Sequence, residues 1–211
     1  MRFYFNIVNI FNNIIFHSYI FIMKKYKPGF TIGVNFTSFG LPIFQVAKDA
    51  SLTIGNRLVL NNHTNYNMVG LYKKCSFAVL EGAKLHIGDN CGFSGVSIYC
   101  TSEIRIGNNI TCGGNVSIWD TDFHPLDYRA RRINDPKHIK HGPISIGNDV
   151  FIGGNSIILK GITIGDRVII GAGSVVTKNV PNDEIWAGNP AKFIKNINNE
   201  TKNNTDYRFF K

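Results

Sequence analysis

Several signatures that would assign a function directly are missing from these 211 residues. No GxxxxGK(S/T) sequence is present, and the GAG segment does not lie between a strand and a helix, so neither a P-loop nor a dinucleotide-binding fold is indicated. No basic run with interleaved aromatic residues occurs, so we expect no nucleic-acid partner. The cysteines form no CxxC pair or other zinc spacing and are interpreted as small core residues in a reducing compartment: Cys75, Cys91, Cys100 and Cys112.

Acidic residues are also few. Against 23 Lys and Arg the chain has 14 Asp and Glu, which gives a formal net charge of +9. A charge of this sign favours an anionic partner, and a phosphate-bearing ligand or a membrane surface explains it as well as nucleic acid does. Glycine and asparagine are abundant instead, and because both tolerate left-handed backbone, many tight corners are expected.

The N-terminal 23 residues form the longest apolar stretch, but they lack a small-x-small cleavage site and precede their basic residues, so no signal peptide is predicted. Polar residues interrupt the stretch on one helical face: Asn6, Asn9, Asn13 and His17. We expect residues 1–29 to form an amphipathic helix and linker. Its wide apolar face would be buried against the rest of the chain or at a membrane interface. A further alternative is that translation begins at Met23.

A six-residue repeat predicts the fold. From residue 146 onward an aliphatic residue leads every hexad: Ile146, Ile152, Ile158, Ile164, Ile170 and Val176. Looser hexads begin at Ile54, Ile87 and Ile106. Neither a helical period nor hairpins, which would need Asn-Gly or Asp-Gly turns, produce this spacing. Each hexad predicts one short strand and one corner, and three hexads make a triangular coil that stacks on the next at about 4.8 Å.

This register, over residues 50–195, resembles the hexapeptide-repeat acyltransferases. The resemblance implies an all-β, left-handed parallel β-helix with an N-terminal helix and a short C-terminal helix or tail. We place the β-helix at residues 30–195 and a polar tail at 196–211. Members of the family are homotrimers with active sites between subunits, so a homotrimer is implied here as well.

Two excursions interrupt the repeat, near residues 61–75 and 120–143, and function is expected where a regular scaffold breaks. The second contains DTDFHPLD, which resembles the catalytic segment of sugar O-acetyltransferases of the maltose, galactoside, nodulation-factor and capsule or colanic-acid types. The resemblance makes His124 the general base. A neutral imidazole suits this role because it can accept the proton of a sugar hydroxyl that attacks a thioester, and Asp120 or Asp122 would orient the ring. His63, His138 and His141 are weaker candidates for substrate contact.

The C-terminal sequences IGAGSVVTKNVP and IWAGNPAKFIK resemble the acetyl-CoA segment of the same family. The resemblance implies that seven residues lie along the cofactor: Gly154, Ala172, Thr177, Lys178, Pro190, Lys192 and Lys195. Small residues permit close approach of the pantetheine arm, and lysines supply charge for phosphates.

The sequence therefore predicts an acetyl-CoA-dependent O-acetyltransferase that modifies a sugar hydroxyl in surface-polysaccharide or glycan biosynthesis, without a metal. One alternative is an N-acetyltransferase of an amino sugar or another small amine. A second is a non-catalytic or metal-binding β-helix protein. We expect a cytoplasmic location, with peripheral membrane contact through the N-terminal helix as a further expectation.

Overall fold

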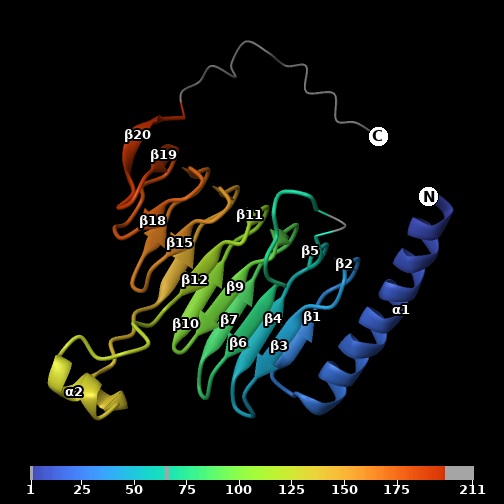
Figure 1. Cartoon of the computed structure of the whole chain (residues 1–211), viewed down its shortest axis with the longest axis horizontal. Coiled ribbons are helices and arrows are strands. Elements are labelled where there is room, and N and C mark those ends of the chain that lie inside the picture. The colour runs from blue at the N-terminus through green and yellow to red at the C-terminus, as the bar shows by residue number, and fades with distance from the viewer. Residues whose placement is uncertain (1, 65–66, 198–211) are drawn as a thin grey trace.

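The computed structural model describes residues 2–64 and 67–197, and Figure 1 shows a helix followed by a stack of short strands. After α1 (Arg2–Tyr26) the chain winds into a parallel β-helix with three sheets. The first sheet contains β1 (Phe30–Ile32), β4 (Ser51–Ile54), β7 (Lys84–Ile87), β10 (Glu103–Ile106), β13 (Ile144–Ile146) and β16 (Thr163–Ile164). The third sheet contains β3 (Ile43–Val46), β6 (Ser76–Val79), β9 (Ser97–Cys100), β12 (Ser117–Trp119), β15 (Ile157–Ile158) and β18 (Val175–Val176).

The second sheet has the same parallel order and then adds one antiparallel strand. It contains β2 (Thr37–Phe39), β5 (Val59–Asn61), β8 (Gly92–Ser94), β11 (Thr111–Gly114), β14 (Phe151–Ile152), β17 (Ile169–Ile170), β19 (Glu184–Ala187) and β20 (Lys192–Asn196). Because β19 and β20 pair antiparallel, the described part of the chain ends in a hairpin. The sequence offered a short C-terminal helix or tail beyond this point. Residues 198–211, most of the predicted tail, lie outside the described residues.

The leading aliphatic residues of the hexads form the core. In the first sheet Ile87, Ile106, Ile146 and Ile164 are register partners on successive coils, so their side chains stack. The six leaders from Ile146 to Val176 are each at most 2% exposed. Burying a side chain of this size contributes roughly 1.5–3 kcal/mol, so each leader of the repeat stabilises the fold directly. The predicted inward orientation is confirmed.

The residues that follow each leader explain the recurring IGN and IGD sequences. Where the first sheet turns into the second, the backbone N–H of Asp89 donates to Asn108 Oδ1 at 2.8 Å, and the N–H of Asn108 donates to Asn148 Oδ1 at 2.9 Å. Each Asn or Asp thus binds the coil before it. Glycine is required beside it, because a Cβ on Gly107 would lie 2.5 Å from the carbonyl oxygen of Gly147.

Helix α1 lies beside β1 and β2 at the N-terminal end of the stack (Figure 1). Among its described side chains, Phe16, Ile20 and Met23 are buried in the common core. Large apolar side chains on its other sides remain exposed: Ile14, Ile15, Phe21, Ile22 and Tyr26. Burial against the rest of the chain therefore accounts for part of the apolar face. The side chains of Asn6, Asn9 and Asn13 lie outside those that the structure describes. Within residues 2–64 and 67–197, no helix is long and apolar enough to span a membrane.

Two long connections leave the coils. Residues 62–75 join β5 to β6, and residues 120–143 join β12 to β13. The second connection projects from the body and contains α2 (Tyr128–Arg132) and the 3-10 helix η1 (Pro136–His138), as Figure 1 shows for α2. The side chains of Asp127 and Asp135 cap these helices by accepting backbone hydrogen bonds. This capping stabilises the two short helices of the excursion.

Candidate active site

His124 lies at the corner where the third sheet turns into the first, at the start of the projecting excursion. Its backbone N–H donates to the carbonyl oxygen of Asp122 at 2.7 Å, and Phe123 between them has a left-handed φ of 62°. The Phe123 ring packs on Tyr99 and Trp119 with centroid distances of 5.0 and 5.5 Å. This tight turn is anchored by the phenyl ring and leaves the His124 side chain exposed to solvent.

A second contact fixes the chain immediately after His124. Arg131 in α2 donates from Nη1 to the carbonyl oxygens of Pro125 and Leu126 at 2.9 and 3.0 Å. Pro125 is buried, whereas Arg131 lies on a helix that projects from the coils. The guanidinium therefore links α2 to the turn that carries His124.

Asp120 does not bond the His124 ring. Its side chain is fully buried and accepts four hydrogen bonds, all from the preceding coil. The donors are the backbone N–H and the hydroxyl of both Thr101 and Ser102, at 2.7 to 2.9 Å. Each carboxylate oxygen of Asp120 thus accepts two hydrogen bonds from these two residues.

Asp122 also has another partner. Its Oδ1 lies 2.5 Å from Lys160 Nζ, while its Oδ2 is buried and has no hydrogen-bond partner in the structure. Both carboxylates thus bind neighbouring coils rather than the His124 ring in the described structure, and that Asp120 or Asp122 orients His124 stays a prediction. Sequence spacing placed them near the histidine but gave no information on which way they point.

The fold brings four of the predicted cofactor residues to one cavity. A cavity of about 310 Å³ beside β18 and β20 is lined by Thr177, Lys178, Pro190 and Lys192, four of the seven predicted residues. The other lining residues are Trp186, Ala191 and Phe193. Sequence reasoning missed the two aromatic side chains, although both lie in the segment that carried the resemblance. Lys195 does not line this cavity and is an exposed residue of β20 that pairs with Ile185.

Gly154 and Ala172 lie at the corner between the second and third sheets, on successive coils. A Cβ on the neighbouring Gly153 would lie 2.4 Å from the backbone nitrogen of Ala172, and a Cβ on Gly154 would lie 3.0 Å from the carbonyl oxygen of Gly114. Ala172 is exposed and Gly154 is partly exposed. This edge consequently presents backbone and small side chains, as close approach of an extended ligand requires.

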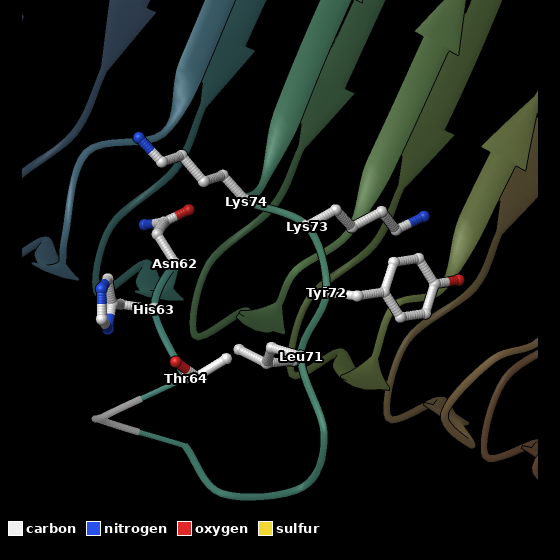
Figure 2. Close-up of a pocket in the computed structure, with 7 residues that line it drawn as sticks. All are labelled: Asn62, His63, Thr64, Leu71, Tyr72, Lys73 and Lys74. Carbon is white, nitrogen blue, oxygen red and sulfur yellow. The ribbon is translucent and has the colours of Figure 1, made fainter.

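The first excursion forms a second pocket at the same edge. Its cavity of about 220 Å³ is lined by Asn62, His63, Thr64, Leu71, Tyr72, Lys73 and Lys74 (Figure 2). In Figure 2 the side chains of Lys73 and Lys74 point to opposite sides of the chain. Lys73 Nζ donates to Ser117 Oγ at 2.8 Å and to the carbonyl oxygen of Val116 at 3.3 Å, and burial lowers the pKa of this amine. Lys73 therefore ties the excursion to a later coil.

The other two histidines of the second excursion have defined partners. His138 Nδ1 lies 2.8 Å from Asp135 Oδ2, beside the cap of η1. His141 Nδ1 lies 2.7 Å from Thr101 Oγ1, and the His141 ring is exposed. Across residues 2–64 and 67–197, no group of three His, Cys, Asp or Glu side chains is placed to hold a metal ion.

Comparison with known proteins shows which family of proteins this chain is similar to. The family model described as the hexapeptide repeat of succinyl-transferase matches residues 143–178. Protein CapG of Staphylococcus aureus is 45% identical over 130 residues, which cover 58% of this chain and 74% of CapG. Galactoside O-acetyltransferase of Escherichia coli is 37% identical over 123 residues, which cover 57% of this chain and 58% of that protein.

Among solved structures, a galactoside acetyltransferase in complex with coenzyme A is 35% identical with a TM-score of 0.51, covering 59% of this chain and 61% of the other. The β-helix is left-handed, as in these neighbours. The chain spans only 56% to 63% of the length of several curated relatives that it matches.

Proposed function

Because the chain belongs to the hexapeptide-repeat acyltransferase family, we propose that it transfers an acetyl group from acetyl-CoA to a hydroxyl group of a sugar. The observation that carries the proposal is the cavity in which Thr177, Lys178, Pro190 and Lys192 meet. These residues come from two segments of the chain, and the coils bring them together. The coenzyme A complex of a 35% identical acetyltransferase supports the same choice of ligand.

The residues present fit acetyl-CoA, which supplies a thioester carbonyl that is already activated toward attack. Lys178 and Lys192 offer charge for its phosphates, and Trp186 and Phe193 offer aromatic faces for its adenine. The small residues Gly154 and Ala172 leave room for the pantetheine arm along the edge between the second and third sheets. Lys195 lies outside the cavity and remains a prediction.

In this proposal His124 is the general base. Its neutral imidazole accepts the proton of the sugar hydroxyl as the oxygen attacks the thioester carbonyl, and the imidazolium then returns the proton to the leaving thiolate. Backbone N–H groups at the edge that carries Gly154 and Ala172 stabilise the developing oxyanion. The exposed position of His124 beside the anchored Phe123 supports this role, because the ring is open to an acceptor.

We also propose that the active enzyme is a homotrimer. Within one chain His124 lies at the corner between the third and first sheets, whereas Gly154 and Ala172 lie at the corner between the second and third sheets. One face of the prism separates these two edges. A symmetric ring of copies would place His124 of one chain against the cofactor edge of its neighbour, and this supports the trimer.

We further propose that the enzyme works at the cytoplasmic side of a membrane, in surface-polysaccharide or glycan biosynthesis. The exposed apolar side chains of α1 include Phe21 and Ile22, which are 69% and 52% exposed, and Lys24 and Lys25 follow them. An apolar helix face with adjacent lysines suits an anionic lipid surface. Vesicles with and without anionic lipid test this contact: a double substitution of Phe21→Ser and Ile22→Ser is expected to abolish co-sedimentation with anionic vesicles, and unchanged binding would contradict it.

The proposed activity is tested by thiol release from acetyl-CoA over a panel of mono- and disaccharides, with amino sugars included. We expect release that depends on a hydroxyl acceptor and that falls by about 10²-fold or more in His124→Ala. Turnover confined to amino sugars would favour N-acetylation instead. Lys178→Ala combined with Lys192→Ala is expected to raise the KM for acetyl-CoA at least about tenfold, since two phosphate contacts are lost. A protein that does not bind acetyl-CoA at all would overturn the proposal.

A further inference from the structure

The described structure gives a supporting carboxylate to His141 rather than to His124. Asp120, fully buried, accepts a hydrogen bond from Thr101 Oγ1 at 2.8 Å, and the same Thr101 Oγ1 lies 2.7 Å from His141 Nδ1. Carboxylate, hydroxyl and imidazole thus form a chain that runs from the buried corner to the surface. The His141 ring is exposed at its outer end.

The hydrogen-bond inventory of this chain fixes the tautomer of His141. A hydroxyl has one proton to donate, and an ionised carboxylate can only accept. In the contact between Thr101 Oγ1 and Asp120 Oδ1 the proton therefore comes from the Thr101 hydroxyl. Thr101 Oγ1 is then left as an acceptor, and His141 must donate to it from Nδ1–H. In the neutral form of the ring, the other nitrogen, Nε2, then carries the lone pair.

His141 and His124 share one corner of the fold. Thr121 and His141 form an antiparallel bridge, and the N–H of Asp122 donates to the carbonyl oxygen of Lys140 at 3.0 Å. His124 follows within the same turn, so the two imidazoles belong to the two paired arms of one excursion. Both side chains are exposed on these paired arms.

We propose that His141 is an acceptor-binding residue whose Nε2 accepts a hydrogen bond from a hydroxyl of the sugar, while His124 accepts the reacting proton. This inference rests on the proposed function. Asp120, which is buried, orients the Thr101 hydroxyl, and Thr101 in turn holds one tautomer of His141. The ring therefore presents an acceptor rather than a donor to the substrate. The residue therefore selects ligands that offer a hydroxyl or another hydrogen-bond donor at this position.

The kinetic test uses a variant that keeps the inner contact and removes the outer one. In His141→Asn the side-chain amide still donates to Thr101, but no group replaces Nε2. We expect the acceptor KM to rise at least about tenfold while the KM for acetyl-CoA stays unchanged. His86→Asn, on the exposed face of β7, is the matched control and is expected to leave both values unchanged. An acceptor KM within twofold of the wild-type value in His141→Asn would overturn the proposal.

Nitrogen-15 NMR of the histidine side chains tests the tautomer without any turnover. Wild-type His141 is expected to carry its proton on Nδ1. Thr101→Val is expected to shift the ring toward the Nε2–H form and to raise the acceptor KM, and Thr101→Ser is expected to restore both. A wild-type His141 protonated on Nε2 would overturn the proposal even if acetyl transfer is confirmed. Absence of acetyl transfer with a Nδ1-protonated His141 would instead count against the proposed function.

Discussion

Glycine at the corner between the first and second sheets gives the sharpest prediction for stability. In Gly107→Ala the new Cβ would lie 2.5 Å from the carbonyl oxygen of Gly147 and 2.7 Å from its carbonyl carbon. Both atoms are backbone of the next coil, so neither can rotate away as a side-chain terminus would. The substitution must push two stacked coils apart locally.

The cost follows from the atoms involved. Overpacking in a rigid environment costs about 1–3 kcal/mol, and here the separation of coils also lengthens the ladder bond between the N–H of Asn108 and Asn148 Oδ1, now 2.9 Å. A hydrogen bond of this kind contributes about 1 kcal/mol. We therefore expect a loss of about 3 kcal/mol, which for a chain of this length lowers the Tm by roughly 6–12 °C.

Gly92→Ala is the matched control. Gly92 is the first residue of β8, and a Cβ there meets no atom within 4 Å. Its φ is not in the left-handed region, so alanine is expected to be neutral or to stabilise by up to about 1 kcal/mol through the unfolded chain. The measurement is urea and thermal unfolding followed by circular dichroism, at one protein concentration because assembly would shift both midpoints. A free energy of unfolding for Gly107→Ala within about 0.5 kcal/mol of the wild-type value is what an ordinary surface substitution gives. That result would show that the packing explanation of the IGN and IGD sequences is wrong.

Three further predictions concern buried polar groups and thiols. Asp120→Asn replaces one acceptor oxygen with an NH₂ group, so donors of Thr101 or Ser102 lose their acceptor. We expect the free energy of unfolding to fall by about 3 kcal/mol, and a fall below about 1 kcal/mol would contradict this. Lys160→Met leaves the partly buried Asp122 carboxylate without its partner, and we expect the midpoint of urea unfolding to fall because the carboxylate is then uncompensated; an unchanged midpoint would contradict this. Burial raises the pKa of the thiols, to about 11 for Cys75 and about 12 for Cys100. Since the folded state keeps these protons after unfolded thiols ionise, stability is full below about pH 8.5 and falls by about 1.4 kcal/mol per thiol and pH unit above it, which denaturation curves between pH 8 and 11 check. A flat profile over that range would show that the thiols ionise equally well in the folded protein.

The sequence by itself determined the fold, for a physical reason that particular residues make plain. Each hexad places its leader inward whatever the other coils do, so Ile146 or Ile158 can be assigned to the core from spacing alone. The same local rule explains why Gly107 and Asn108 recur as a pair, because each corner binds the coil before it. Thr177 and Lys178 were proposed as cofactor residues from the resemblance of IGAGSVVTKNVP to the acetyl-CoA segment, and the structure brings both to one cavity.

Only the tertiary structure decided which partners the polar residues of the excursions have. Asp120, Asp122 and His124 are neighbours in the chain, yet Asp120 turns inward to the coil before it, Asp122 pairs with Lys160 on a later coil, and His124 turns outward. Thr101 carries no motif and became visible only because stacking places it between Asp120 and His141. Side-chain direction in an irregular loop depends on contacts between residues far apart in sequence, and no period encodes it. The hexad repeat therefore determines the β-helix, whereas the partners of the polar side chains at its corners depend on how the coils stack.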